Sequence, residues 1–84
     1  MADNDHSPQW VNVENELLRL LRQMQEKWAN ALHAAHKCQR MRLEDPEGCL
    51  ASLDEAISQA NELETLTKNY IEVLNKMKDL VKSQ

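Results

Sequence analysis

The sequence contains few of the residues that interrupt helices or build sheets. Its 84 residues include one glycine and two prolines, no phenylalanine, and only three aromatic side chains. A β-sheet favours aromatic and β-branched residues and needs turn residues between its strands. The chain is instead rich in Leu, Ala, Glu, Gln, Lys and Met, which favour helix. Composition therefore predicts an all-α fold.

Neither acidic nor basic residues are in large excess. The formal net charge is −4, and acidic and basic residues are interspersed along the chain. Nucleic-acid-binding proteins usually present a basic face or arm, which this balance does not supply. The chain has two short groups of basic residues, which we expect to lie in water near the ends of helices, because cations favour helix C-termini. A nucleic-acid or membrane-surface contact through them is the weaker alternative. The groups are Lys37, Arg40 and Arg42, and Lys76, Lys78 and Lys82.

Long apolar runs are absent as well. No segment approaches the ~20 residues of a membrane-spanning helix. The first five residues are mostly acidic or polar and lack the apolar core of a signal peptide. A chain of this length forms at most one domain. The sequence thus predicts a soluble protein inside the cell, in the cytoplasm or nucleus, with no membrane span.

Two stretches without glycine or proline flank one interruption at residues 44–48. Ser7 can cap a helix that has Pro8 at its first position, and Asp45 can do the same for Pro46. A link this short places two helices antiparallel. The prediction is a disordered polar tail over residues 1–7 and a helical hairpin over 8–84, with a helix at about 8–43, a turn at about 44–46 and a helix at about 47–82.

Two alternatives to these boundaries stay open. Ser52 and Glu55 have the spacing of a capping box, so the second helix has an alternative start there. A single helix continuing through Pro46 is the other, although it loses a backbone hydrogen bond and places the proline ring against the preceding turn.

Heptad spacing of apolar residues runs through both helices and predicts the face that each turns toward the other. We call these two rows the predicted inner seams. In the first helix the row is Leu17, Leu21, Met24, Trp28, Ala31, Ala35 and Cys38. In the second it is Leu53, Ala56, Ala60, Leu63, Thr67, Tyr70, Leu74, Met77 and Val81.

Large apolar residues also flank these rows, at positions that are usually charged in a two-stranded coiled coil. Full burial of one such side chain is worth ~1.5–3 kcal/mol, so a lone hairpin leaves on the order of 10 kcal/mol unused. A coiled-coil-like or four-helix-bundle assembly uses this surface. The flanking residues are Leu18, Leu20, Leu32, Met41, Ile57, Leu66, Ile71, Val73 and Leu80.

The expected partner is a second copy, giving a homodimer, or another helical protein; a monomer with inward-curled flanks is the alternative. Alanines thin the helices near the turn, so the bulky open end is expected to hold the main contact. Leu20→Glu and Val73→Glu should then disrupt the oligomer. The expected interface comprises Trp10, Val13, Leu17, Leu18, Leu20, Leu21, Met24, Trp28, Leu32, Met41, Ile57, Leu66, Tyr70, Ile71, Val73, Met77 and Leu80.

Cys38 and Cys49 precede and follow the turn and are predicted to face each other. Two reduced, buried thiols are the favoured interpretation, and a disulfide is the geometrically possible alternative. His33 and His36 lie near Cys38, but no third or fourth ligand accompanies them, so no metal site is expected.

Catalytic signatures are missing from the sequence. There is no nucleophile elbow, phosphate-binding glycine loop or zinc-binding histidine motif, so we expect neither an enzyme nor a cofactor. The predicted function is a structural interaction subunit or adaptor. The alternative is a small chaperone or regulator that sequesters an amphipathic helix of a client.

Overall fold

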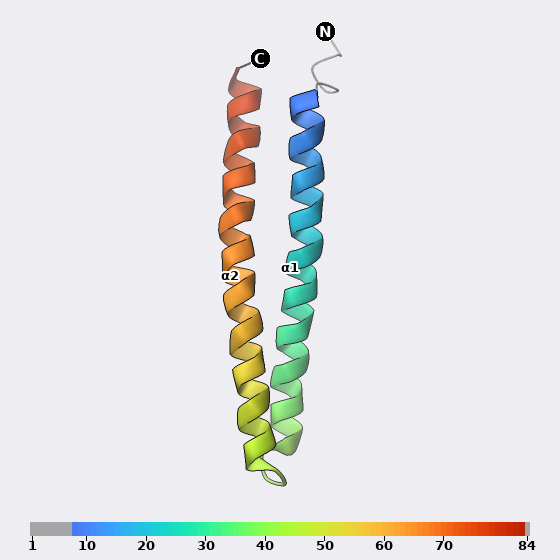
Figure 1. Ribbon diagram of the computed structural model, residues 1–84, viewed down its shortest axis with the longest axis vertical. Coiled ribbons are helices and arrows are strands. Elements are labelled where there is room, and N and C mark those ends of the chain that lie inside the picture. The colour runs from blue at the N-terminus through green and yellow to red at the C-terminus, as the bar shows by residue number, and fades with distance from the viewer. Residues whose placement is uncertain (1–7, 84) are drawn as a thin grey trace.

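The computed structural model describes residues 8–83 and contains two long helices. Helix α1 spans Pro8–Met41 and helix α2 spans Pro46–Lys82. They lie side by side and antiparallel, with the turn at one end and the start of α1 and the end of α2 at the other (Figure 1). The predicted all-α helical hairpin is confirmed. The predicted tail over residues 1–7, including Ser7, lies outside the described residues.

Pro46 and Asp45 determine where the turn lies. Proline disfavours helical geometry in the residue before it, and Asp45 adopts φ −145° and ψ 79°. Its carboxylate accepts a hydrogen bond of 3.0 Å from the Gly48 N–H and so caps α2. The Asp45 N–H donates to the Met41 carbonyl at 2.7 Å. Helix α1 therefore ends at Met41, two residues before the predicted position, and α2 begins at Pro46.

Both alternative boundaries are excluded by this turn. The chain reverses at Pro46, so it is not one continuous helix. Ser52 lies inside α2 and is buried against α1, so it is not the cap. The side chains of Met41 and Asp45 approach the backbone of Gly48 closely. A Cβ atom at this position would overlap both of them, so glycine fits here.

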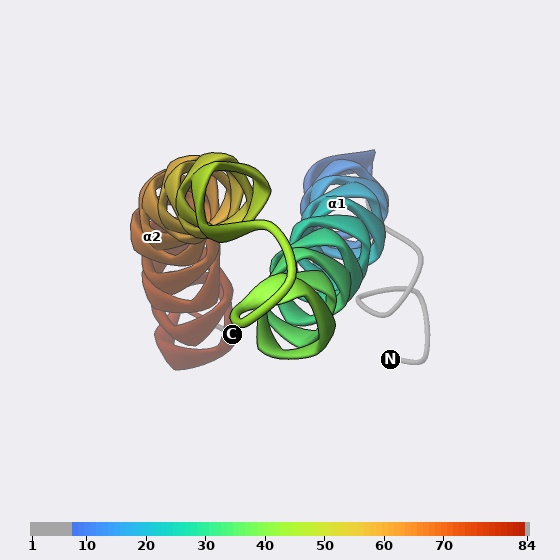
Figure 2. The ribbon, with the colours of Figure 1, turned by 90° about the horizontal axis from the view of Figure 1, so that it is seen from below.

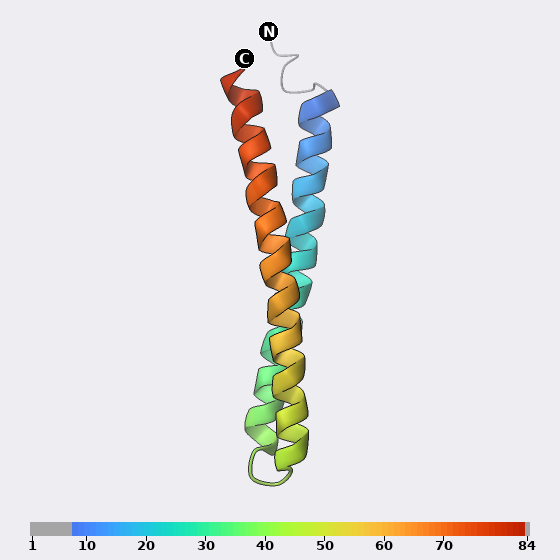
Figure 3. The same ribbon diagram turned by 60° about the vertical axis from the view of Figure 1, so that its left-hand side comes forward.

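The hairpin is a single layer of two helices. Its principal extents are 64 × 16 × 13 Å. Viewed along its length, each described helix has the other as its only neighbour (Figure 2), and the two cross at a shallow angle (Figure 3). Over the described residues, neither helix combines the length and hydropathy needed to cross a bilayer. Because there is no second layer over residues 8–83, only one strip of each helix is covered.

Candidate interaction surface

One continuous seam joins the two helices, with steps that alternate between three and four residues. Its centre of burial is formed by Leu20 and Val73, which are 3% and 1% exposed. Every seam residue is buried or partly buried. From α1 these are Trp10, Val13, Leu17, Leu20, Met24, Lys27, Ala31, Ala34, Cys38 and Met41. From α2 they are Cys49, Ser52, Ala56, Gln59, Leu63, Leu66, Tyr70, Val73, Met77 and Leu80.

The predicted inner seams were right at alternate positions and wrong at the others. Leu17, Met24, Ala31, Cys38, Ala56, Leu63, Tyr70 and Met77 do belong to the seam. At the remaining steps the structure places the preceding residue between the helices, so that Lys27 replaces Trp28 and Val73 replaces Leu74. Of the predicted residues at these steps, Leu21, Ala35 and Thr67 are partly buried beside the seam, and the exposed ones are Trp28, Leu53, Ala60, Leu74 and Val81.

Polar pairs at the edge of the seam, each with one member in it, establish the register of the helices. The Lys27 ammonium lies 2.9 Å from the Glu62 carboxylate, and the Asn30 amide donates to the Gln59 side-chain oxygen at 3.4 Å. The hydrogen bond to Glu62 raises the pKa of Lys27 above its ordinary value, and partial burial opposes this rise. These pairs place Lys27 level with Glu62, and Asn30 level with Gln59.

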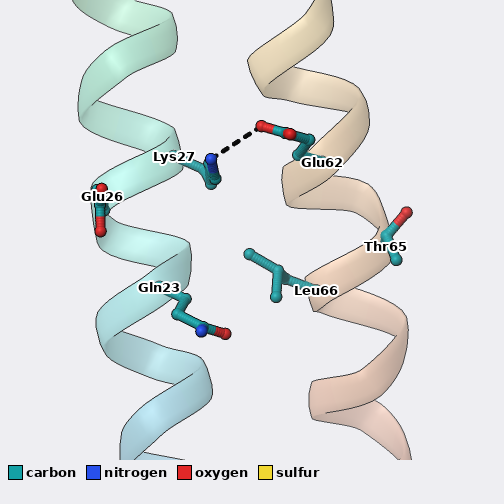
Figure 4. Close-up of a pocket in the computed structure, with 6 residues that line it drawn as sticks. All are labelled: Gln23, Glu26, Lys27, Glu62, Thr65 and Leu66. Atoms are coloured by element: carbon teal, nitrogen blue, oxygen red, sulfur yellow. Dashed lines mark ion pairs between the residues drawn. The ribbon is translucent and has the colours of Figure 1, made fainter.

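One long side of the hairpin is polar. The residues immediately before the seam positions line shallow grooves along this side. Figure 4 shows the central groove, where Gln23 and Glu26 of α1 lie across from Glu62 and Thr65 of α2. Further grooves toward the two ends are lined in part by Asn30, His33, Lys37 and Glu55, and by Asn12, Glu16, Lys76 and Asp79.

The opposite side carries most of the exposed large hydrophobic residues. Eleven large hydrophobic residues of the described chain are exposed, and ten of them come directly after a seam residue. One residue turns a helix by about 100°. Because residues before the seam positions line the same grooves from both helices, residues after them lie together on the other side. We call these ten the apolar face: Val11, Leu18, Trp28, Leu32, Leu50, Leu53, Ile57, Ile71, Leu74 and Val81.

The apolar face contains five of the residues expected at a partner interface. Leu18, Trp28, Leu32, Ile57 and Ile71 are between 41% and 58% exposed. Leu21 lies on the same side and is partly buried. The other eleven expected residues are in the seam: Trp10, Val13, Leu17, Leu20, Met24, Met41, Leu66, Tyr70, Val73, Met77 and Leu80.

One expectation about partner contact needs correction. Leu20 and Val73 were expected to contact a partner, but each is buried against the other helix of its own chain. Their replacement by Glu would break the hairpin itself. The main contact at the open end stays a prediction, and the apolar face itself runs from Val11 and Val81 to Leu50 beside the turn.

Sequence reasoning did not place five members of the apolar face at the interface. Val11 and Leu50 were assigned to no row, and Leu53, Leu74 and Val81 were assigned to the inner seam. A usable signal was present: these residues continue the steps of three and four that join Leu18, Trp28, Ile57 and Ile71.

Cys38 and Cys49 do face each other at the turn end of the seam. The structure joins them in a disulfide, with a Cα–Cα distance of 4.2 Å. The favoured interpretation, two reduced thiols, therefore differs from the structure, because the small residues around the turn bring both helices close enough for the bond. His33 and His36 line a surface groove with Gln39 and Arg40. Within residues 8–83, no three His, Cys, Asp or Glu side chains converge as metal ligands.

Comparisons with protein-family models, with curated proteins and with solved structures found no match to this chain.

Proposed function

We propose that this hairpin is a structural interaction module that assembles with other helices through its apolar face. The supporting observation is that ten of the eleven exposed large hydrophobic residues lie on one long side. Isolated exposed apolar residues are ordinary on protein surfaces, whereas a contiguous apolar patch is typical of an interaction site. The polar opposite side keeps its charged residues in water.

The amount of apolar surface that stays exposed in the single chain supports the same proposal. The ten side chains are between 39% and 62% exposed. Full burial of an exposed aliphatic side chain is worth ~1.5–3 kcal/mol, so covering the remaining surface of ten contributes on the order of 10 kcal/mol. Small domains have net stabilities of only ~5–15 kcal/mol. A covering layer of helices therefore changes the stability of this chain substantially.

Helices suit this surface better than other occupants. The residues of the apolar face occupy positions along both helices that follow heptad spacing, which is the pattern of a bundle core. The module fits a role as an adaptor or subunit, and our proposal includes no catalytic step. We propose a location inside the cell. The Cys38–Cys49 bond favours an oxidising compartment there over the cytoplasm or nucleus, where protein thiols are kept reduced.

Photo-cross-linking in the source cell tests this proposal. A photoreactive amino acid replaces Leu18 or Ile71 on the apolar face, or Glu26 or Asn69 on the polar side as matched controls. We expect protein adducts from the apolar-face positions and few from the controls. Equal labelling from both sides, or no protein adduct from either apolar-face position, would overturn the proposal.

A further inference from the structure

We propose that the occupant of the apolar face is a second copy of this chain, held by a two-fold axis parallel to the helices. Both turns then lie at the same end, and α1 of each copy packs over α2 of the other. This inference rests on the proposed function and specifies its partner. It is carried by complementary side-chain sizes at two levels of the face and by opposite charges toward the open end.

The register of the seam defines those levels. Lys27 lies level with Glu62, and Asn30 lies level with Gln59. Because the helices are antiparallel, residues at one level have numbers that add up to about 89, as in these two pairs. Trp28 is thereby level with Ala60, and Leu32 with Ile57. The same register continues to Leu18 beside Ile71 and to Ala35 beside Leu53.

Side-chain sizes complement each other across these levels. The largest residue of the apolar side, Trp28, shares its level with the small Ala60, and the small Ala35 shares its level with Leu53. In the proposed dimer each α1 residue meets the α2 residue of its own level from the second copy. At these two levels large residues therefore meet small ones, which favours close packing, whereas Leu32 meets Ile57 and Leu18 meets Ile71.

Charged and polar residues on this side also complement each other. Gln25 lies level with Glu64, near the middle of each helix. In the proposed dimer the Gln25 amide of one copy can donate to the Glu64 carboxylate of the other. Glu64 also pairs with Lys68 of its own helix at 3.6 Å. Toward the open end, Glu14 of one copy lies within one helical turn of Lys78 of the other, so opposite charges face each other.

A dimer with the turns at opposite ends fits less well. There α1 packs on α1 and α2 on α2, so Trp28 meets the Leu21 level of the second copy. Small residues then meet small ones on the other side, where Ala60 faces Thr67. Glu64 of one copy also lies beside Glu64 of the other, which places like charges together in an apolar layer. The observations therefore favour turns at the same end.

The size of the face is sufficient for a stable dimer. A 37-residue helix is about 55 Å long at 1.5 Å per residue, and the hairpin is 16 Å across. Their product is roughly 900 Å², against the ~800 Å² that each partner buries in an interface of standard size.

Cross-linking of the purified full chain tests both the partner and its orientation. Glu44→Cys places a thiol in the exposed turn, and Ser83→Cys places one at the open end. A short bismaleimide is added to each variant alone and to a mixture of the two. We expect covalent Glu44→Cys dimers, and light scattering should give twice the chain mass of 9.7 kDa. Ile71→Glu should abolish the dimer, whereas Asn69→Glu, with the same charge change, should retain it.

Each contrary result overturns a defined part of the inference. Covalent products that form only between Glu44→Cys and Ser83→Cys chains would show turns at opposite ends. A single-chain mass at all concentrations would exclude the second copy. Cellular adducts from Leu18 and Ile71 to a different protein would then leave the proposed function intact, and absence of any adduct would remove both.

Discussion

Lys27 is a charged residue at a seam position where neighbouring steps carry apolar side chains. It is tolerated because its ammonium group reaches the edge of the seam and lies 2.9 Å from Glu62. Glu62 raises the pKa of Lys27, so the folded state binds this proton more tightly than the unfolded chain does. The pair therefore stabilises the hairpin below a pH of about 10.5, and this contribution is lost as pH rises through the raised pKa.

Thermal unfolding of Lys27→Met at neutral and strongly alkaline pH checks this contribution. We expect the wild-type melting temperature to fall further between the two conditions than that of the variant, because only the wild type loses the pair. Lys68→Met, which removes an exposed lysine, should retain the wild-type pH dependence. Identical pH dependence in wild type and Lys27→Met would contradict the account.

Asp45 is the residue that stops one helix and starts the next. Asp45→Ala removes the acceptor of the Gly48 N–H and should lower the free energy of unfolding by about 1 kcal/mol. Asp45→Asn retains a side-chain oxygen and should retain most of that stability. Urea unfolding of both variants measures the difference. An Asp45→Ala variant as stable as Asp45→Asn would show that the cap does not hold the turn.

The Cys38–Cys49 bond closes a short loop around the same turn, with a sequence separation of 11. Alkylation without reductant should leave both thiols unlabelled in mass spectrometry. Reduction should lower the free energy of unfolding by about 3 kcal/mol, through the chain entropy restored to the unfolded state. Rapid labelling of both residues in the native protein would show instead that they are free thiols.

At the scale of the helices, sequence reasoning predicted the hairpin but not the rotation of each helix. Pro46, Asp45 and the absence of other breaks locate the turn, because their effects are local. Two apolar rows, one residue apart, follow the same steps in each helix, so spacing alone does not distinguish them. Hydropathy favoured Trp28 for the seam, whereas packing placed Lys27 there because Glu62 lies opposite it on the other helix.

Two identical substitutions separate the roles of these rows. Val73 is 1% exposed in the seam and Val81 is 55% exposed on the apolar face. In a Leu18→Glu background, where assembly through the face is blocked, Val73→Ala should cost about 2 kcal/mol of unfolding free energy. Val81→Ala should cost less than about 0.5 kcal/mol there. Equal losses in denaturant unfolding would contradict the assignment of the seam.

At the scale of the whole molecule, the hairpin needs a partner that covers its apolar face. A layer 13 Å thick has no interior of its own beyond the seam. Trp28 and Ile71 are 57% and 51% exposed in the single chain, and Leu43, in the turn, is 84% exposed. Leu43 lies outside the apolar face and thus provides an internal reference for any measurement of accessibility.

Hydroxyl-radical footprinting of the protein, isolated natively together with whatever it binds, measures that coverage directly. We predict that Trp28 and Ile71 are oxidised several-fold more slowly than in a Leu18→Glu hairpin, while Leu43 reacts equally in both. Oxidation of Trp28 and Ile71 at the same rate in both proteins would mean that the apolar face is open to water, and would contradict the account.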